Sequence, residues 1–354
     1  MRQYRKIIEQ IRQRHVPDIR AGVFDVELAA APDGIRISGV TTQPEAIDEL
    51  IAVVTLKNVG VRIDDDVIRL PDPRLGKGHA ALVRTAVAPI YEEPRLPAPQ
   101  ISQAVMGVRM EVLSRTGNWL RIRGEDGYLG WVQQGYVIVG DREWATSWER
   151  GASGEAVVSL GAELVDADGR TLSRPPWGAR LVRRGGAYLL PDGRTGSLAN
   201  GEVVDVDRLT DRFPARGESV ARSARRWHGA PYLWGGVTQS GVDCSGLSQA
   251  VLWMHGVALP RDSDLQAHVG QLVEHGADFD GLAAGDLAFF AEDGARINHV
   301  AICLGGSHII HSALSNGGVE VNDMLGETEF EHRLRALFTH ARRLLPDVPT
   351  SPAV

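Results

Sequence analysis

A glycine-rich turn that leads into a helix headed by a cysteine is the feature that most constrains how this chain can fold. Residues 230–236 read Ala-Pro-Tyr-Leu-Trp-Gly-Gly, and after six further residues the segment 243–247 reads Asp-Cys-Ser-Gly-Leu. Apolar residues then recur at helical spacing from Leu247 to Met254, which places Cys244 at or near the first turn of a predicted helix. Unpaired backbone N–H groups and the helix dipole favour an anion there, so we expect a lowered pKa for the Cys244 thiol.

Two downstream histidines supply the base that a thiol nucleophile needs. His299 stands at the start of the apolar run 299–302, and His311 follows twelve residues later. If the two strands pair across a turn centred between residues 305 and 306, position 300 faces 311, and the imidazoles become neighbours within a one-residue shift. His299 would then take the Cys244 proton while His311 fixes its tautomer.

Zinc is the chemical alternative for this group, because Cys244, His299, His311 and Asp243 are all possible ligands. The sequence contains no Cys-x-x-Cys and no His-Glu-x-x-His, and a thiolate at a helix start has a purpose without metal. The Gly235-Gly236 turn also lacks the Lys and Ser/Thr that complete a phosphate-binding loop. We therefore expect neither a metal nor a cofactor.

The composition narrows the possible partners and the compartment. The chain carries 38 Lys and Arg against 45 Asp and Glu, a net charge of −7, so it lacks the positive field of a non-specific nucleic-acid binder. It contains no run of 18 apolar residues, and no export signal follows Met1. Two cysteines cannot form a disulfide framework. The sequence therefore predicts a cytoplasmic protein with neither a nucleic-acid nor a membrane partner.

Changes in pattern divide the chain into four predicted segments. Residues 1–79 mix helix and strand signals, with helices expected over 4–11 and 44–55 and strands over 23–28 and 35–40. Residues 80–140 show short strands separated by turns, expected over 82–88, 103–106, 109–115, 119–123 and 128–132, which is typical of a small antiparallel barrel. Residues 155–208 repeat this pattern more weakly, which predicts a second barrel. The connection between them is either a linker or a short helix.

The remaining segment, residues 215–341, has helices before strands. Helices are expected over 219–227 and 245–255, followed by strands over 286–290, 299–303 and 308–311. This order matches a segregated α+β domain better than alternating βαβ units.

Four short motifs, in this order and spacing, give the C-terminal segment a specific resemblance. The motifs are Pro231-Tyr232-x-Trp234-Gly235-Gly236, Asp243-Cys244-Ser245-Gly246, Gly285-Asp286-Leu287 and Asn298-His299-Val300-Ala301-Ile302. Residues 215–341 resemble the NlpC-type papain-like cysteine peptidases, which cut bacterial cell-wall peptides, and the two barrels resemble bacterial Src-homology-3-like modules. The whole arrangement is similar to intracellular γ-D-glutamyl-L-diamino acid endopeptidases, which cleave free peptides such as L-Ala-γ-D-Glu-diaminopimelate in murein recycling.

The resemblance implies roles for residues around the nucleophile. Tyr232 would help the Cys244 backbone N–H to stabilise the oxyanion. Asp262 would bind the ammonium of a free peptide N-terminus, while Ser263 and Ser245 would bind the α-carboxylate of the γ-linked D-Glu. Asp243, next to the nucleophile, is included among the predicted substrate-binding residues.

The resemblance also implies that the first barrel restricts the site to free N-termini through a glutamate and a tyrosine. Glu93 and Tyr128 stand in matching places, and Glu92 competes with Glu93 for the role. Two other functions stay open from the sequence: a catalytically silent protein that binds wall peptides, and an amidase or acyltransferase on the same fold.

Overall fold

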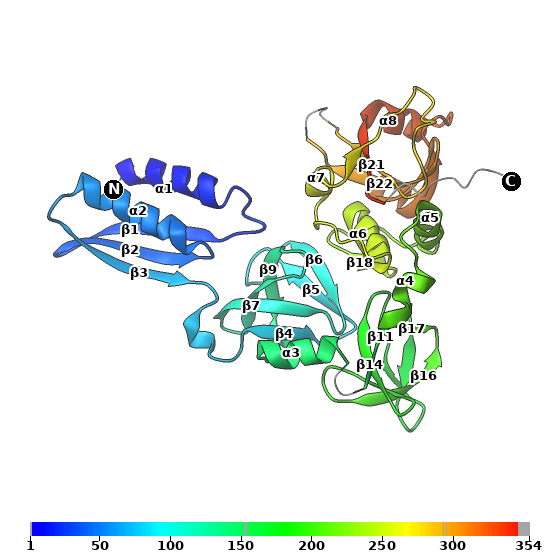
Figure 1. The fold of residues 1–354 in the computed structure, drawn as a ribbon, viewed down its shortest axis with the longest axis horizontal. Coiled ribbons are helices and arrows are strands. Elements are labelled where there is room, and N and C mark those ends of the chain that lie inside the picture. The colour runs from blue at the N-terminus through cyan, green and yellow to red at the C-terminus, as the bar shows by residue number, and fades with distance from the viewer. Residues whose placement is uncertain (1, 152–153, 293, 295, 346–354) are drawn as a thin grey trace.

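The computed structural model describes residues 2–151, 154–292, 294 and 296–345, which form four successive units (Figure 1). We call them the N-terminal unit (residues 2–72), the first β unit (73–140), the second β unit (155–208) and the C-terminal domain (209–345). The first β unit lies between the N-terminal unit and the other two. Within the described residues, no helix is both long and apolar enough to cross a bilayer.

The N-terminal unit packs two helices against a three-stranded sheet. Its elements are α1 (Arg2–His15), β1 (Phe24–Ala31), β2 (Gly34–Thr41), α2 (Pro44–Lys57) and β3 (Arg62–Arg69). β1 is antiparallel and β3 parallel to β2, and α2 makes the crossover that the parallel pair requires. Ile37 and Leu50 are fully buried between helices and sheet. The sequence did not predict β3, an edge strand whose run of three aspartates obscures its strand pattern.

The first β unit is a seven-stranded antiparallel sheet in the order β10-β4-β7-β8-β9-β5-β6. Its strands are β4 (Ala80–Val83), β5 (Val87–Tyr91), β6 (Gln100–Val105), β7 (Arg109–Thr116), β8 (Trp119–Arg123), β9 (Leu129–Gln133) and β10 (Val137–Gly140). The single strand predicted over 82–88 is wrong. The chain turns after Val83, because β4 pairs with β7 and β10 whereas β5 pairs with β6 and β9.

The connection to the second β unit is a short helix, α3 (Arg142–Glu149). Asp141 caps it by accepting a hydrogen bond from the Trp144 N–H at 2.8 Å. The second β unit is again a seven-stranded antiparallel sheet, in the order β13-β12-β16-β15-β14-β11-β17. Its strands are β11 (Glu155–Ser159), β12 (Glu163–Val165), β13 (Thr171–Ser173), β14 (Arg180–Arg184), β15 (Ala187–Leu189), β16 (Thr195–Asn200) and β17 (Val203–Asp205).

The C-terminal domain has the predicted α+β architecture. Its helices are α4 (Leu209–Arg212), α5 (Gly217–Arg225), α6 (Cys244–Met254), α7 (Ser263–Gln266) and α8 (Glu329–Leu337). Its main strands are β20 (Gln271–Leu272), β21 (Leu287–Phe290), β22 (His299–Gly305), β23 (His308–Ala313), β24 (Gly318–Asp323) and β25 (Phe338–Arg343), in the order β20-β25-β21-β22-β23-β24. A small hairpin, β18 (Val237–Thr238) with β19 (Gly241–Val242), precedes α6. Leu247 and Val251 of α6 share a buried core with Val300 and Ile302 of β22.

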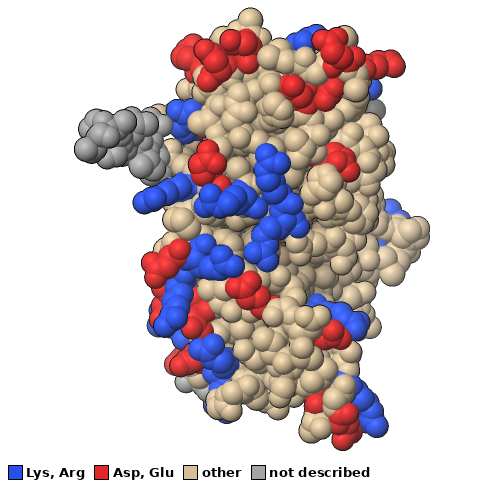
Figure 2. All heavy atoms as spheres, turned by 90° about the vertical axis from the view of Figure 1, so that its right-hand side faces the viewer, with Lys and Arg blue, Asp and Glu red and all other residues tan. Residues whose placement is uncertain are grey.

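An arginine-rich segment covers part of the face turned away from the N-terminal unit. Lys and Arg side chains gather at mid-height of this face, at the level of α4 and α5 (Figure 2). Residues 208–226 contribute six exposed arginines, several of which are paired: Arg212 lies over the Phe213 ring and near Glu202, and Arg226 lies over the Trp177 ring.

Candidate active site

Cys244 is the first residue of α6, and the start of this helix is closely supported. The Asp243 side chain is the N-cap and accepts a hydrogen bond from the Gly246 N–H at 2.7 Å. Gly246 has to be glycine, because a Cβ there would come within 2.1 Å of the Gly236 carbonyl oxygen. The glycine-rich turn therefore packs directly against the first turn of α6 and fixes the backbone that carries the thiol.

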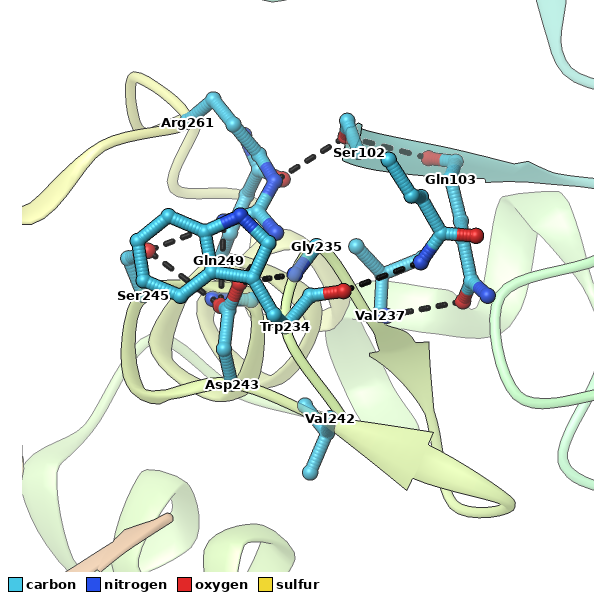
Figure 3. Close-up of polar contacts among 12 residues, drawn as sticks. Ser102, Gln103, Trp234, Gly235, Val237, Val242, Asp243, Ser245, Gln249 and Arg261 are labelled. Atoms are coloured by element: carbon cyan, nitrogen blue, oxygen red, sulfur yellow. Dashed lines mark hydrogen bonds and ion pairs between the residues drawn. The ribbon is translucent and has the colours of Figure 1, made fainter. Parts of the chain in front are cut away.

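The guanidinium of Arg261 completes this support (Figure 3). It binds the two carboxylate oxygens of Asp243 at 3.0 and 2.6 Å and the Ser245 hydroxyl at 2.9 Å. Its Nε donates to the Ser102 hydroxyl of β6 at 3.0 Å, so one side chain links the first β unit to the start of α6. Arg261 is only 1% exposed. A charge buried to this extent needs a paired, hydrogen-bonded partner, which Asp243 provides.

The Cys244 thiol is under opposing influences. Burial raises its pKa and the Asp243 carboxylate raises it further, whereas the backbone N–H groups of Val300 and Ser245 lower it; together they raise the pKa to about 12. The predicted lowering of the thiol pKa is therefore wrong. The helix start does supply N–H groups, but it also needs a carboxylate as its N-cap, and that charge together with desolvation outweighs them.

His299 and His311 lie side by side, as the sequence predicted. Nε2 of His299 is 2.6 Å from Nδ1 of His311, and Nε2 of His311 is 3.0 Å from Oδ1 of Asn322. Because the Asn322 oxygen can only accept, the proton of His311 is on Nε2, and its Nδ1 accepts from His299. This arrangement leaves Nδ1 of His299 unprotonated, as a general base requires.

The strand register that brings the two rings together differs by one residue from the predicted register. Ile302 pairs with Ile310, and a bulge beside Gly305 shifts the pairing before the turn. The same register sets residue 301 opposite residue 311, so His299 and His311 are diagonal neighbours on one face of the sheet. The bulge is accommodated by Gly305, whose φ of +107° is unfavourable for other residues.

Both imidazoles are neutral at pH 7. Burial, followed by the neighbouring His311, lowers the pKa of His299 well below its ordinary value, and burial lowers the pKa of His311 to about 4. The Cys244 thiol lies beside the backbone of Val300, next to His299, and the Cys244 and His299 side chains line the same cleft. The resting pair is therefore a thiol and a neutral imidazole, and proton transfer accompanies the attack of the sulfur.

Tyr232 lies close to the thiol. Burial raises its pKa, and Cys244 and Asp243 raise it further, to about 12, so the phenol stays protonated and can donate a hydrogen bond. Its backbone N–H donates to the Gly317 carbonyl at 2.9 Å, which anchors it to the loop before β24. This geometry is compatible with the oxyanion role that the resemblance implies.

Three of the four units line one cleft of about 1680 Å³ around Cys244. The C-terminal domain contributes Tyr232, the histidines, Asp262 and Ser263; the first β unit contributes Tyr128; and the N-terminal unit contributes residues between Arg12 and Asp25. The Tyr128 hydroxyl hydrogen-bonds to the Asp262 carboxylate, and burial together with this carboxylate raises the Tyr128 pKa. The structure thus brings together two residues predicted to bind an ammonium.

No group of three or more His, Cys, Asp or Glu side chains is arranged to hold a metal ion in the part of the chain that the structure describes. His299 and His311 direct ring nitrogens at each other. This arrangement holds His299 in the tautomer that a general base requires.

Comparison with known families assigns the domain that holds this geometry. Residues 229–337 match the family model described as the NlpC/P60 family, and residues 86–138 match the bacterial SH3 domain. The chain contains an NlpC/P60 domain. Cys244, His299, His311 and Tyr232 all fall within the NlpC/P60 match, whereas Tyr128 falls within the SH3 match.

Two relatives match this chain to different extents. The γ-D-glutamyl-L-lysine dipeptidyl-peptidase of Bacillus cereus is 26% identical, over 69% of this chain and 75% of that protein. The Bacillus subtilis protein of the same name is 37% identical, over 34% of this chain and 40% of that protein.

Solved structures share the fold. A crystal structure of an NlpC/P60 family protein from Bacillus cereus has a TM-score of 0.62 at 22% identity and covers 75% of this chain and 100% of that one. An NlpC/P60 endopeptidase from Photobacterium damselae subsp. piscicida has a TM-score of 0.56 at 17% identity and covers 77% and 72%. The C-terminal and upstream units therefore occur together in known folds.

Glu93 does not face the NlpC/P60 site as the sequence predicted. Its carboxylate pairs with the exposed Arg95 at 2.6 Å, within the same loop. Glu92 lines the cleft instead. Both glutamates lie in the bend that follows β5, which ends at Tyr91, so the path of this bend decides which of them faces the site.

Two side chains that were predicted to bind the substrate, those of Asp243 and Ser245, are hydrogen-bonded within the protein. Asp243 accepts hydrogen bonds at both oxygens, from backbone N–H groups and from Arg261, and the Ser245 hydroxyl binds Asp243 and Arg261. Both residues therefore hold the start of α6. Both also line the cleft, and their contact with the substrate stays a prediction. Ser263 lines the cleft, and its role as a carboxylate ligand stays a prediction.

Sequence reasoning missed Asn322, Arg261 and Arg20. Asn322 lies on β24, a strand that the sequence analysis did not predict. Arg261 directly precedes Asp262 in a segment already singled out, but no local pattern shows that it is buried against Asp243. Arg20 comes from the N-terminal unit, and its side chain bonds to Asp262 across 242 positions of sequence.

Proposed function

We propose that this protein is a cysteine peptidase that hydrolyses the bond between γ-D-glutamate and an L-diamino acid in short murein peptides with a free N-terminal L-Ala. One observation carries the proposal: Cys244, the His299–His311 pair and the Asp262–Tyr128 pair line one cleft, and Asn322 holds His311 from behind. The names of the Bacillus cereus and Bacillus subtilis relatives, γ-D-glutamyl-L-lysine dipeptidyl-peptidase, support the same bond.

The reaction is acyl transfer to water. The Cys244 sulfur attacks the carbonyl carbon of the amide while its proton passes to Nδ1 of His299. The oxyanion that forms accepts hydrogen bonds from the protonated Tyr232 hydroxyl and the Cys244 backbone N–H. His299 then protonates the leaving amine of the diamino acid, and the C–N bond breaks to leave a thioester. Water, deprotonated by His299, hydrolyses the thioester and releases the dipeptide.

Recognition of the substrate's amino end fits the charges in the cleft. The ammonium of L-Ala binds Asp262, with Glu92 as a second carboxylate on the wall. The α-carboxylate of D-Glu takes a hydrogen bond from Ser263 at the start of α7. A blocked N-terminus removes the charge that Asp262 attracts, so the peptide's free amine is part of the specificity.

We also propose that the enzyme acts on released peptides in murein recycling and works in the cytoplasm. Support comes from the resemblance to intracellular endopeptidases and from a cleft whose walls come from three units. Fractionation of cells that produce the protein, with activity assayed in each fraction, tests the location. Cleavage of free tripeptide compared with intact sacculi tests the recycling role.

The test of the reaction uses L-Ala-γ-D-Glu-L-Lys and L-Ala-γ-D-Glu-diaminopimelate. The Cys244→Ala variant is expected to lose hydrolysis and to keep the thermal melting of the wild type. Cys303→Ala, which changes a buried strand cysteine, is the matched control and should stay active. Equal turnover by Cys244→Ala and wild type would contradict the proposal, and a wild type that binds the peptides without cleaving them would identify a binding protein.

A further inference from the structure

The N-terminal unit sends one loop into the cleft, and Arg20 is at its centre. All five N–H groups of the Arg20 guanidinium have carboxylate partners. Nε and one terminal nitrogen bind Asp18, the other binds Oδ2 of Asp262 at 2.8 Å, and both terminal nitrogens bind Asp264, at 2.8 and 3.0 Å. Three carboxylates around one guanidinium give this group of four side chains a net charge of −2, and Arg296 lies near Asp264 on the cleft wall.

The loop that carries Arg20 is fixed to the first β unit. The backbone carbonyl of Arg20 accepts a hydrogen bond from the Leu129 N–H at 2.7 Å, one residue after Tyr128. Val23 is 1% exposed and packs against Leu113 and Leu129. Arg20 and Tyr128 therefore reach Asp262 from one connected piece of structure.

Asp262 depends on these two contacts for its orientation. It occupies the N-cap position of α7, but its side chain makes no capping hydrogen bond to that helix. Its Oδ2 binds Arg20 and its carboxylate also binds the Tyr128 hydroxyl. A carboxylate has about four lone-pair positions, so Asp262 keeps the capacity to accept from an ammonium while held by both neighbours.

Removing the guanidinium would set three like charges against one another. Asp18, Asp262 and Asp264 would lose their shared counter-ion, and repulsion would turn the Asp262 carboxylate away from the Tyr128 side of the cleft. Arg20 itself has no N–H left for a substrate carboxylate. Its role is therefore to hold other groups.

From this geometry we propose that the 17–23 loop of the N-terminal unit completes the subsite for the peptide's free amine, and that Arg20 is the positioning residue that orients Asp262. The inference rests on the proposed function, because it assigns a place to the ammonium of the same substrate. It gives the N-terminal unit, whose purpose the sequence left open, a part in substrate selection.

The experiment compares Arg20→Ala, Arg20→Lys and wild type on L-Ala-γ-D-Glu-L-Lys and on its N-acetylated form. Arg20→Ala is expected to raise KM for the free amine at least about tenfold and to change kcat less than about twofold, because the loss is in ground-state and transition-state binding alike. The preference for the free amine over the acetylated peptide should fall by the same factor. Arg20→Lys, which keeps the charge but cannot bridge three carboxylates, should lie between.

Binding without turnover gives a second readout. In the Cys244→Ala background, the Kd of the free tripeptide from calorimetry should rise about tenfold on adding Arg20→Ala. Arg36→Ala is the matched control: Arg36 pairs with Asp66 at 3.1 Å on the exposed side of the same unit, and its loss should leave Kd and KM unchanged. If Arg20→Ala melts below the assay temperature, the KM and Kd of Arg20→Lys are compared with those of the wild type instead, and unchanged values would contradict the inference.

The outcomes separate this inference from the proposed function. A wild type that does not cleave the tripeptide refutes the proposed function itself. A wild type that cleaves it and prefers the free amine, together with Arg20 variants of unchanged KM and Kd, refutes only the role of Arg20. A lower KM in Arg20→Ala would show that Arg20 obstructs the subsite, which also overturns the inference.

Discussion

The start of α6 has two opposite effects on the pKa of the Cys244 thiol. The first turn of α6 offers the thiol the backbone N–H of Ser245, yet the same turn is capped by the Asp243 carboxylate. Both neighbouring imidazoles are neutral, and the positive charge of Arg261 lowers the thiol pKa by less than burial and Asp243 raise it. Reactivity then depends on proton transfer to His299 during attack.

This environment predicts how alkylation of Cys244 depends on pH. Because its thiol pKa is raised to about 12, the thiolate fraction grows across the whole working range, and the rate of iodoacetamide labelling should rise from about pH 6 to about pH 10 without a plateau. Mass spectrometry of the labelled peptide measures the rate, with the fully buried Cys303 as an internal control that should stay unlabelled. A plateau between about pH 5 and 8 would instead indicate a preformed thiolate–imidazolium pair.

From the lowered pKa of His311 we predict that the stability of the folded protein depends on pH. Its pKa is lowered to about 4 in the folded protein, against about 6.5 in an unfolded chain, so the unfolded state binds more protons between these values. The stability that neutral His311 provides is complete above about pH 6.5 and is lost as the pH falls toward 4. From pH 7 to pH 4.5, the free energy of unfolding of the wild type should therefore fall by about 2–3 kcal/mol more than that of His311→Gln. Urea unfolding at both pH values measures this, and equal losses would contradict it.

At the scale of elements, the start of α6 and the segment before α7 form one support. Arg261 stands just before α7, yet its guanidinium holds the N-cap of α6 and reaches β6. One buried charge therefore connects the ends of these three elements. We expect a displacement of any of them to shift the position of the thiol.

The burial of this ion pair predicts a large effect of Arg261→Met. Removing one partner leaves the Asp243 carboxylate buried without its counter-ion, which should cost about 3 kcal/mol of stability and lower kcat. Arg95→Met is the matched control, because Arg95 pairs with Glu93 at the same 2.6 Å but on the surface. We expect no measurable change in its melting temperature. Similar melting for the two variants would show that burial does not matter here.

At the scale of the molecule, the cleft exists because the C-terminal domain docks closely on the first β unit. Gly235 has a φ of +73°, and a Cβ on it would lie 3.1 Å from backbone atoms of residues 100–102 in β6. Gln100 donates to the Trp234 carbonyl at 3.0 Å beside it. This close approach places Tyr128 within reach of Asp262.

The docking predicts that Gly235→Ala affects activity and Gly117→Ala does not. Both substitutions force a left-handed backbone at a cost of about 1–2 kcal/mol, but Gly117, with a φ of +58°, has nothing within 4 Å of an added Cβ. Gly235→Ala must also push β6 away, which should raise KM several-fold, whereas Gly117→Ala should change only the melting temperature. Equal KM values for the two variants would show that the interface tolerates the shift.

The sequence by itself determined the parts that depend on local order. Apolar residues at helical spacing after Cys244 predicted a helix headed by the thiol, and the apolar run after His299 predicted a strand, so α6, β22 and the proximity of His299 to His311 followed from spacing. The α+β class and the resemblance to NlpC-type peptidases rest on the same local signals.

Only the tertiary structure decided which charges meet. Whether Glu92 or Glu93 faces the cleft, whether the Cys244 pKa rises or falls, and that Arg20 holds Asp262 all depend on groups far apart in sequence. Electrostatic and desolvation energies depend on distance and burial in space, and neither can be read from spacing along the chain.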